Sequence, residues 1–398
     1  MYLLPKPKTI KEQDGQMLLC HSTHIVMTKE VAETEMHAAK RLQEAIRQET
    51  GLILPFSVGE VREGDLSLGI AKTLPEQTYE ITIDEKGGQI SGGDGAGVLY
   101  GVETFCQIVQ QCGGILPCVQ IQDAPDMPNR GYYFDQTRGR VLKLEELKKI
   151  ADRMCRYKLN QLQLYVEHTY LFRDFSEMWR DQTPLTAEEI LELDSYCRER
   201  HIELVPSLAS FGHLCTLLST KTYGDLCEME DSWKEPFSFW NRMRYHTINV
   251  SDERSLPLIK KMIAEYMQLF SSNKFNICAD ETFCLGKYKS KKLAEERGVH
   301  RLYIDYVKEL AQFLVENGKI PMFWGDIIWN SPELMKELPE SMICLNWGYA
   351  PEQREDETRA IAQTGAVQYL CPGVCGWNQW ANLIENSYKN ITRMCGYA

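Results

Sequence analysis

The chain has 398 residues, of which 43% are hydrophobic and 25% are charged, so it is long enough for two globular domains. Its formal net charge of -12 argues against a nucleic-acid partner, because a groove that follows phosphates needs clustered lysine and arginine. The longest basic run, residues 287–292, is interpreted as a solvated loop. No apolar run is long enough for a membrane span, so we expect no membrane partner.

A signal peptide begins with positively charged residues, continues with an apolar stretch and ends at a cleavage site of small residues. The N-terminal residues do not follow this pattern, so the sequence predicts no signal peptide. Its fourteen cysteines are scattered, and Cys155, Cys197 and Cys278 fall within apolar patterns that are typical of reduced core cysteines. We therefore expect a reducing compartment and a cytoplasmic protein. Cys371 and Cys375 have no second pair or nearby histidine, so the sequence predicts no metal and no cofactor.

Residues 1–125 are predicted to form a small α+β domain. A helix is expected over residues 30–50, with Gly51 as its stop signal. Strands are expected over residues 66–70, 79–83 and 89–91, and a glycine-containing hairpin joins the last two. The glycine cluster at residues 92–97 lacks the spacing of a phosphate-binding loop. It is therefore interpreted as a tight turn before a helix over residues 98–111.

Residues 126–398 alternate short strands with amphipathic helices, which is typical of a parallel sheet. Strands are expected over residues 131–136, 160–166, 202–207, 275–279, 320–325, 342–347 and 366–371. Helix starts are signalled by a capping box at Thr186 and Glu189 and by Ser331 before Pro332. The repeat predicts an α/β fold, a (β/α)8-type barrel with its chemistry at the C-terminal strand ends. Only seven strands are found. The barrel is therefore expected to lack its last strand, to be shortened at its C-terminus and to stay open between its first and seventh strands.

Charged, polar and aromatic side chains follow the predicted strand ends. They are Arg138, Glu167, His168, His213, Asp280, Glu281, Trp324, Asp326, Trp347, Tyr369 and Trp377. Aromatic faces stack on a sugar ring while charged groups bind its hydroxyls, so this mixture predicts a carbohydrate site. Taken singly, Trp347 could be a core residue and Arg138 a structural ion pair. The shared position of all these residues at strand ends favours a functional site.

The most informative stretch is the apolar strand over residues 275–279, which leads into Asp280 and Glu281. Neighbours on an extended chain point in different directions, so these two are not expected to act as opposed acid and nucleophile across one glycosidic bond. One carboxyl can instead protonate the leaving oxygen while the other orients a group of the substrate. A 2-acetamido group can supply the nucleophile from its own carbonyl oxygen.

Several motifs, in order, resemble those of glycoside hydrolase family 20, the β-N-acetylhexosaminidases. The barrel motifs are Arg130–Arg138, Lys158–Leu164, Phe211–His213 and Asp280–Glu281. The stretches Leu4–Lys8 and Gly95–Thr104 are similar to that family's N-terminal α+β domain. The resemblance covers nearly the whole chain.

The resemblance implies that Glu281 is the general acid/base and that Asp280 accepts the acetamido N–H and stabilises the oxazolinium charge. His213 is similar to the histidine that supports the acid/base together with an acidic residue after the second strand. Family members often carry paired aspartates there, whereas this chain has Glu167 and His168. The supporting role is assigned to Glu167, and His168 remains an alternative.

The resemblance also implies which residues bind the sugar. Arg138 resembles the arginine that binds the ring hydroxyls, and Tyr369 the tyrosine that donates to the acetamido oxygen. Trp324, Trp347 and Trp377 resemble the indoles that enclose the sugar, and His168 and Asp326 are further candidates for binding it. The eighth strand of the family, which brings another tryptophan and an acidic residue, is absent from this sequence.

The function expected from this resemblance is exo-hydrolysis of terminal N-acetylglucosamine or N-acetylgalactosamine from a glycan or glycoconjugate, by substrate-assisted retaining catalysis. Two alternatives remain open. One is a related hydrolase, either acetamido-directed or acting on a free amine. The other is a carbohydrate-binding or inactive homologue, which the missing strand favours and the complete carboxylate pair opposes.

Overall fold

The computed structural model describes residues 1–377 and 379–398, which form two compact units. The first unit comprises Met1–Tyr132, Lys143–Leu162 and Glu192–Leu204, and the second comprises Tyr133–Leu142, Gln163–Leu191 and Val205–Ala398. Within the described residues, no helix combines the length and the apolar character that a membrane span requires.

The first unit contains a mixed seven-stranded sheet with the order β1-β7-β5-β6-β4-β2-β3. The strands are β1 (Thr9–Leu18), β2 (Ile25–Met27), β3 (Phe56–Val58), β4 (Leu66–Ile70), β5 (Tyr79–Asp84), β6 (Gly87–Gly92) and β7 (Ile115–Asp123). The predicted hairpin is confirmed, because β5 and β6 pair antiparallel with Asp84 opposite Gly87. The sequence prediction missed β1, β2, β3 and β7. The residues of β1 are largely exposed and polar, so its apolar pattern is weak.

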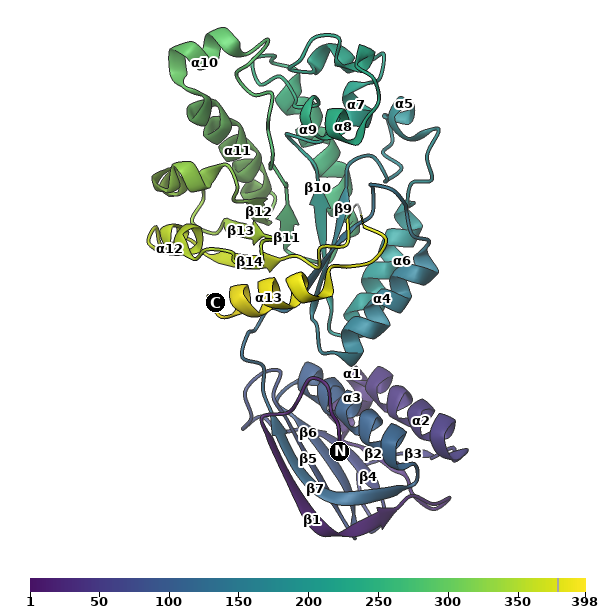
Figure 1. The fold of residues 1–398 in the computed structure, drawn as a ribbon. Coiled ribbons are helices and arrows are strands. Elements are labelled where there is room, and N and C mark those ends of the chain that lie inside the picture. Colours follow the sequence, from purple (N-terminus) through teal and green to yellow (C-terminus); the bar gives the residue numbers. More distant parts are fainter. Residues whose placement is uncertain (378) are drawn as a thin grey trace. The chain divides into compact units, whose positions relative to one another are not determined.

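Three helices lie on one face of this sheet (Figure 1): α1 (Lys29–Thr34), α2 (Met36–Thr50) and α3 (Gly95–Cys112). The helix predicted over residues 30–50 is interrupted at Glu35, and Gly51 ends α2 in the left-handed conformation, as expected. The tight turn predicted over residues 92–97 is confirmed only at Gly93 and Asp94, because Gly92 ends β6 and α3 already begins at Gly95. A Cβ on Gly97 would lie 2.2 Å from the backbone oxygen of Thr78, so only glycine fits there.

The second sheet has seven strands in the order β14-β13-β12-β11-β10-β9-β8. They are β8 (Gly131–Asp135), β9 (Gln161–Val166), β10 (Glu203–Leu208), β11 (Lys274–Asn276), β12 (Ile320–Trp324), β13 (Ile343–Gly348) and β14 (Gln368–Pro372). The pairs from β10 to β14 are parallel, and the sheet curls with helices between its strands (Figure 1). The predicted barrel type and its seven strands are confirmed. In the described part of the chain β8 and β14 stand at opposite ends of the strand order, so the sheet is open there as expected.

The helices that follow β8 are α4 (Leu144–Arg156), α5 (Ser176–Trp179), α6 (Ala187–Arg198), α7 (Cys215–Leu218), α8 (Phe239–Arg244), α9 (Ser255–Tyr266), α10 (Lys291–Arg297), α11 (Val299–Glu316), α12 (Asp356–Ala362) and α13 (Ile384–Cys395). Short 3₁₀ turns are η1 (Gly224–Leu226), η2 (Ser232–Lys234), η3 (Met267–Leu269), η4 (Ile328–Asn330) and η5 (Pro332–Glu337).

The two predicted helix starts have different outcomes. The capping box before α6 is confirmed, because Thr186 and Glu189 exchange two side chain to backbone hydrogen bonds of 2.9 and 3.2 Å. The prediction for Ser331 is wrong. Pro332 opens only the 3₁₀ turn η5, and the Ser331 hydroxyl makes no cap bond but lies 2.8 Å from Nδ1 of His300.

Candidate active site

The segment that follows β11 carries the adjacent carboxylates, and it is not extended. The sequence predicted a strand as far as Ala279, which is wrong, because β11 ends at Asn276. Cys278, Ala279 and Glu281 have φ values of 57°, 63° and 48°, in the left-handed region. Such conformations are unfavourable for residues with a side chain and persist where surrounding contacts hold them.

Two tyrosines of α11 hold this segment and the one after β10. The Tyr303 hydroxyl donates to the backbone oxygen of Ala279 at 3.0 Å, and the Tyr306 hydroxyl donates to that of Ser210 at 3.0 Å. The ring of Phe211 packs against both tyrosine rings, with centroid distances of 5.6 and 4.3 Å. The sequence prediction missed both tyrosines. Their spacing of three residues on one helix face is the signal that would have found them.

The imidazole of His213 lies close to the carboxylates of both Asp280 and Glu281. A Cβ on Gly212 would be 2.6 Å from the backbone oxygen of Asp280, so glycine allows the two segments to approach. Nε2 of His213 is 3.4 Å from Oδ2 of Asp280 and 3.3 Å from Oε2 of Glu281. We expected the carboxylates to point in different directions, and this expectation is wrong. The backbone is left-handed rather than extended, and both groups therefore face the same imidazole.

Charge is concentrated around this imidazole. Burial disfavours the imidazolium, but Asp280 and then Glu281 outweigh burial and raise the pKa of His213 to about 10. Burial alone would raise the pKa of Asp280, but the charge of His213, followed by that of Arg138, holds it below its ordinary value. At neutral pH the site therefore contains an imidazolium and an ionised Asp280.

Glu167 follows β9 and is 3% exposed. Its carboxylate accepts hydrogen bonds of 2.9 Å from Tyr165 and 2.9 Å from Arg242, and it lies 3.9 Å from Nε of Arg138. Burial alone would raise the pKa of Glu167, but Arg242 and then Arg138 and His213 hold it below its ordinary value. Glu167 is therefore a buried carboxylate that two guanidinium groups keep ionised.

His168 lies beside Glu167, with Nδ1 at 3.9 Å from the Glu167 carboxylate and 3.2 Å from the Thr216 hydroxyl. Burial is the largest influence on this ring and lowers its pKa. Burial thus favours the neutral imidazole at this position. The sugar contact assigned to His168 stays a prediction.

Arg242 is the partner of Glu167 that the sequence did not reveal. It belongs to α8, in the long segment between β10 and β11, far from any strand end. The neighbouring Met243 also reaches the site, because its sulfur lies 3.2 Å from Nη1 of Arg138. No residue pattern marks this segment, so only the folded chain identifies it.

Replacing Arg242 with leucine is expected to lower the free energy of unfolding by about 3 kcal/mol, because it removes a partner of a buried carboxylate. The measurement is urea unfolding of the parent, Arg242→Leu, Glu167→Gln and the double variant. In the Glu167→Gln background the arginine substitution should cost much less. An equal cost in both backgrounds would show that Arg242 does not act through Glu167.

Arg138 follows β8 and is oriented by three neighbours. Its Nε donates to Asp135 at 2.6 Å, and its guanidinium lies 4.7 Å from the ring centre of Tyr165. Burial disfavours its charge, but Tyr165, Asp135 and Glu167 raise its pKa. A fixed, charged guanidinium of this kind can bind hydroxyl groups.

Asp326 fixes the backbone of Glu281. Its Oδ2 accepts a hydrogen bond of 3.0 Å from the Glu281 N–H. Burial, followed by the charge of Asp280, raises the pKa of Asp326 from 3.8 to about 7. Asp326 is therefore a carboxyl group that changes charge near neutral pH.

Because the folded state raises this pKa, Asp326 contributes stability that is complete below about pH 4 and is lost as pH rises through about 7. In Asp326→Asn the amide oxygen can still accept the hydrogen bond from the Glu281 N–H. Because an amide does not titrate, the variant does not lose this stability as pH rises. We expect the stability of Asp326→Asn relative to the parent to increase between about pH 6 and about pH 8.5. Urea unfolding at both pH values measures this. A difference independent of pH would contradict the raised pKa.

Aromatic rings form a wall beside the charged groups. Trp347 of β13 has ring neighbours Trp329 at 5.8 Å and Tyr349 at 4.9 Å, and Tyr349 lies 4.5 Å from Trp377. Burial, followed by the charge of Asp280, raises the pKa of Tyr349. The sequence prediction missed Trp329 and Tyr349. Both follow strand ends, β12 and β13, and this position could have identified them.

Two further predicted residues lie on β12 and β14, the two strands that flank β13 in the sheet. Trp324 ends β12, is largely buried and meets the ring of Tyr133 edge-on at 4.8 Å. Tyr369 is half-buried on β14, in register with Leu345 of β13. The structure thus places both on the strands that carry the site, and their sugar contacts stay predictions.

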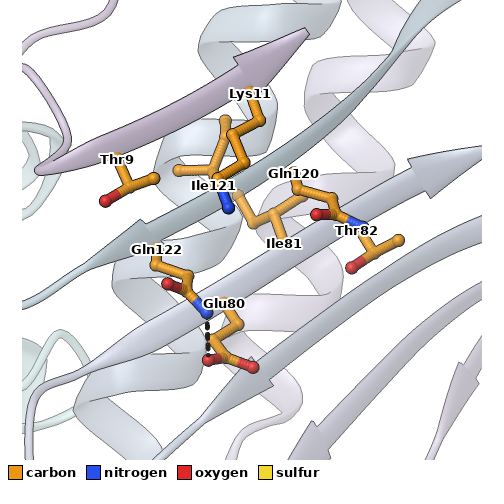
Figure 2. Close-up of a pocket in the computed structure, with 8 residues that line it drawn as sticks. All are labelled: Thr9, Lys11, Glu80, Ile81, Thr82, Gln120, Ile121 and Gln122. Carbon is orange, nitrogen blue, oxygen red and sulfur yellow. Dashed lines mark hydrogen bonds between the residues drawn. The ribbon is translucent and has the colours of Figure 1, made fainter. Parts of the chain in front are cut away.

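A hollow on the first sheet is distinct from this site. Figure 2 shows its lining residues, which come from β1, β5 and β7: Thr9, Lys11, Glu80, Ile81, Thr82, Gln120, Ile121 and Gln122. Its polar side chains include a hydrogen bond of 2.8 Å from Gln122 to Glu80. None of the predicted site residues lines it.

Comparison with known proteins bears on both parts of the chain. Residues 1–124 match the model of glycosyl hydrolase family 20, domain 2, and residues 128–394 match that family's catalytic domain. A β-hexosaminidase of Porphyromonas gingivalis is 24% identical over 411 residues, covering 94% of this chain and 50% of its own length. The chain spans about half the length of such curated relatives.

Solved structures share the fold. A chitobiase of Flavobacterium johnsoniae has a TM-score of 0.79 and 20% identity, covering 94% of this chain and 59% of its own. An exo-β-N-acetylglucosaminidase of Vibrio harveyi in complex with N-acetylglucosamine has a TM-score of 0.77 and 19% identity, covering 93% and 60%. With family models matched along most of its length, the chain belongs to glycosyl hydrolase family 20.

Proposed function

We propose that this chain is a β-N-acetylhexosaminidase that releases terminal N-acetylhexosamine from glycans with retention of configuration. The observation that carries the proposal is the pair of carboxylates, Asp280 and Glu281, facing the buried imidazole of His213 at 3.4 and 3.3 Å. The names of the relatives and the N-acetylglucosamine bound to the Vibrio harveyi protein support the substrate class.

The arrangement of the carboxylates favours substrate-assisted chemistry. In a two-carboxylate retaining mechanism, the acid and the nucleophile flank the sugar. Here both groups turn toward one histidine, so they lie side by side rather than on opposite sides of a ring. The nucleophile is then the carbonyl oxygen of the substrate's own acetamido group. Asp280, which the cation of His213 keeps ionised, accepts the acetamido N–H and balances the positive charge that develops.

Bond changes in the first step follow from these roles. The acetamido oxygen attacks C1 of the sugar while the glycosidic C1–O bond breaks, and Glu281 donates its proton to the leaving oxygen. A bicyclic oxazolinium remains. In the second step water attacks C1, Glu281 takes a proton from this water, and the acetamide re-forms. Two inversions at C1 retain the β configuration.

The surrounding residues position these groups. Asp326 holds the backbone of Glu281, and α11 holds the preceding turn through Tyr303. The rings of Trp347 and Tyr349 offer apolar surface for the sugar, and Arg138 offers a charged donor for its hydroxyls.

The test is hydrolysis of a nitrophenyl β-N-acetylglucosaminide and its galacto epimer, compared with the corresponding glucosaminide that carries a free amine. We expect turnover of acetylated substrates and none of the amine, because an amine lacks the carbonyl oxygen. NMR of the first product should show the β anomer. Equal turnover of acetylated and free-amine substrates would refute substrate assistance. No turnover of either would favour the inactive homologue.

We also propose a reducing, cytoplasmic location. All fourteen cysteines are free, and Cys20 and Cys395 are exposed, which suits a compartment that keeps thiols reduced. Fractionation of cells with an antibody to this chain tests the location. Recovery of the chain outside the cytoplasm would contradict it.

A further inference from the structure

The helix α8, whose Arg242 reaches into the site, also contacts the segment that carries Glu281. Sγ of Cys284, three residues beyond Glu281, donates to the backbone oxygen of Arg244 at 3.0 Å. This contact holds the last residue of α8 beside the segment of the proposed acid/base. Since Glu281 has to touch the leaving oxygen, the surface around Arg244 is next to the part of the substrate that leaves.

Two exposed aromatic rings accompany Arg244 on this surface. Its guanidinium carbon lies 4.6 Å from the ring centre of Trp240 and 5.8 Å from that of Phe283, so cation–π attraction holds the charge there. The Phe283 N–H donates to the backbone oxygen of Glu281 at 2.7 Å, which keeps this ring close to the acid/base. Trp240 is 64% exposed and Phe283 is 37% exposed, so both rings are accessible to a ligand.

The charge of Arg244 has no carboxylate partner in the described part of the chain. Neighbouring arginines do have one, since Arg242 pairs with Glu167 at 2.9 Å and Arg254 pairs with Asp252 at 2.7 Å. Arg244 is exposed, and among the described residues it forms no ion pair. A guanidinium presents its N–H donors as a planar fork, which matches the two oxygens of a carboxylate. Arg244 is therefore suited to bind a carboxylate that a ligand brings.

We propose that the leaving part of the substrate is a hexuronic acid, whose carboxylate binds Arg244 while its ring contacts Trp240 and Phe283. Its place as the leaving part rests on the proposed function, which puts the leaving oxygen at Glu281. In a hexuronic acid linked through O4, the carboxylate is on C5, next to the carbon that carries the glycosidic oxygen. The charge therefore lies close to the bond that breaks, on the side where Cys284 holds Arg244.

The local charges explain why Arg244 decides between acidic and neutral sugars. A uronate carboxylate near Asp280 and Glu281 is repelled unless a cation faces it. A neutral sugar has no such repulsion and needs only the aromatic rings. Specificity is a difference between two affinities, so Arg244 should favour the acidic sugar over its neutral counterpart.

The test is calorimetric binding of two S-linked disaccharides, in which sulfur replaces the glycosidic oxygen so that hydrolysis does not interfere. Both carry N-acetylglucosamine joined β-(1→4) to a methyl glycoside, of glucuronic acid in one and of glucose in the other. They differ only at the substituent of C5. We expect the full chain to bind the uronate about 5–10-fold more tightly, as for a bidentate pair at an exposed site. In about 1 M NaCl, which screens exposed charges, this preference should shrink.

Substitutions at Arg244 show whether it is the source of the preference. Arg244→Gln should abolish the preference, and Arg244→Lys, which keeps the charge but not the fork, should retain only part of it. Because Arg244 is exposed, its replacement opens no cavity in the core. Arg359→Gln, at an exposed arginine of α12, is the matched control and should keep the whole preference. Circular dichroism and thermal unfolding show whether each variant is folded.

Hydrolysis of a nitrophenyl N-acetylglucosaminide by the same protein separates this inference from the proposed function. Hydrolysis together with equal binding of the two disaccharides, or with a preference that survives Arg244→Gln, would overturn the inference and retain the activity. Binding of neither disaccharide would also overturn the inference. A preference that depends on Arg244 in a chain without hydrolysis would retain the uronate site and refute the activity. In an active chain, kcat/KM for the two O-linked disaccharides should differ by the same 5–10-fold, as expected for about 1 kcal/mol of an exposed ion pair.

Discussion

Replacing Glu281 with glutamine is expected to slow hydrolysis of an alkyl or glycosyl N-acetylglucosaminide by about 10²–10⁴-fold, which is the usual contribution of general acid catalysis. The amide has no proton to give to the leaving oxygen. A nitrophenyl leaving group is already a stable anion, so its release should slow much less. The measurement is kcat/KM for both substrate types with the parent and Glu281→Gln.

The position of Glu281 makes this test specific. Its side chain is 28% exposed, so substrate can reach it. The carboxylate of Glu281 faces the imidazole of His213, and its backbone N–H donates a hydrogen bond to Asp326. Glu296→Gln, at an exposed carboxylate on α10, is the matched control and should change neither rate. Equal losses on both substrate types would remove Glu281 from the acid role.

The elements that the sequence predicted well are those whose signals are local. The capping box of Thr186 and Glu189 needs only four neighbouring residues, and it forms as expected. The apolar stripe of α9, from Ile259 to Tyr266, is buried because its spacing follows the helix period. The seven parallel strands follow from the alternation of such segments, and their C-terminal ends located most of the candidate site.

Other features depend on contacts between distant segments, and the sequence could not reveal them. The left-handed turn at Cys278 and Ala279 depends on Tyr303 of α11, so a local pattern predicts a strand instead. The same turn brings Asp280 and Glu281 to one face, opposite to what an extended chain would do. Arg242 reaches Glu167 from a segment 75 residues away, and no spacing rule connects them.

Asp280→Asn is expected to reduce kcat/KM on every N-acetylhexosaminide, activated or not, by about 100-fold or more, or about 3 kcal/mol. This expectation rests on the ionised state of Asp280. Burial acts to raise the pKa of Asp280, but the charge of His213 holds it below its ordinary value. A neutral amide cannot balance the positive oxazolinium. Glu281→Gln should slow substrates with poor leaving groups more than those with good ones, but Asp280→Asn should slow both equally. The reason is that the charge of the Asp280 carboxylate acts on the oxazolinium ring as it forms, and not on the departing oxygen.

Two measurements separate this electrostatic role from a structural one. A thiazoline that mimics the oxazolinium should inhibit the parent protein and bind Asp280→Asn more weakly. The pKa of His213, which Asp280 raises more than any other group does, should fall in the variant, and NMR of the imidazole can follow it. Both changes should occur in a chain that unfolds at nearly the temperature of the parent. A thiazoline that bound both proteins equally would show that Asp280 does not stabilise the intermediate, because a carboxylate that balances the charge of this ring must bind its mimic more tightly than a neutral amide does.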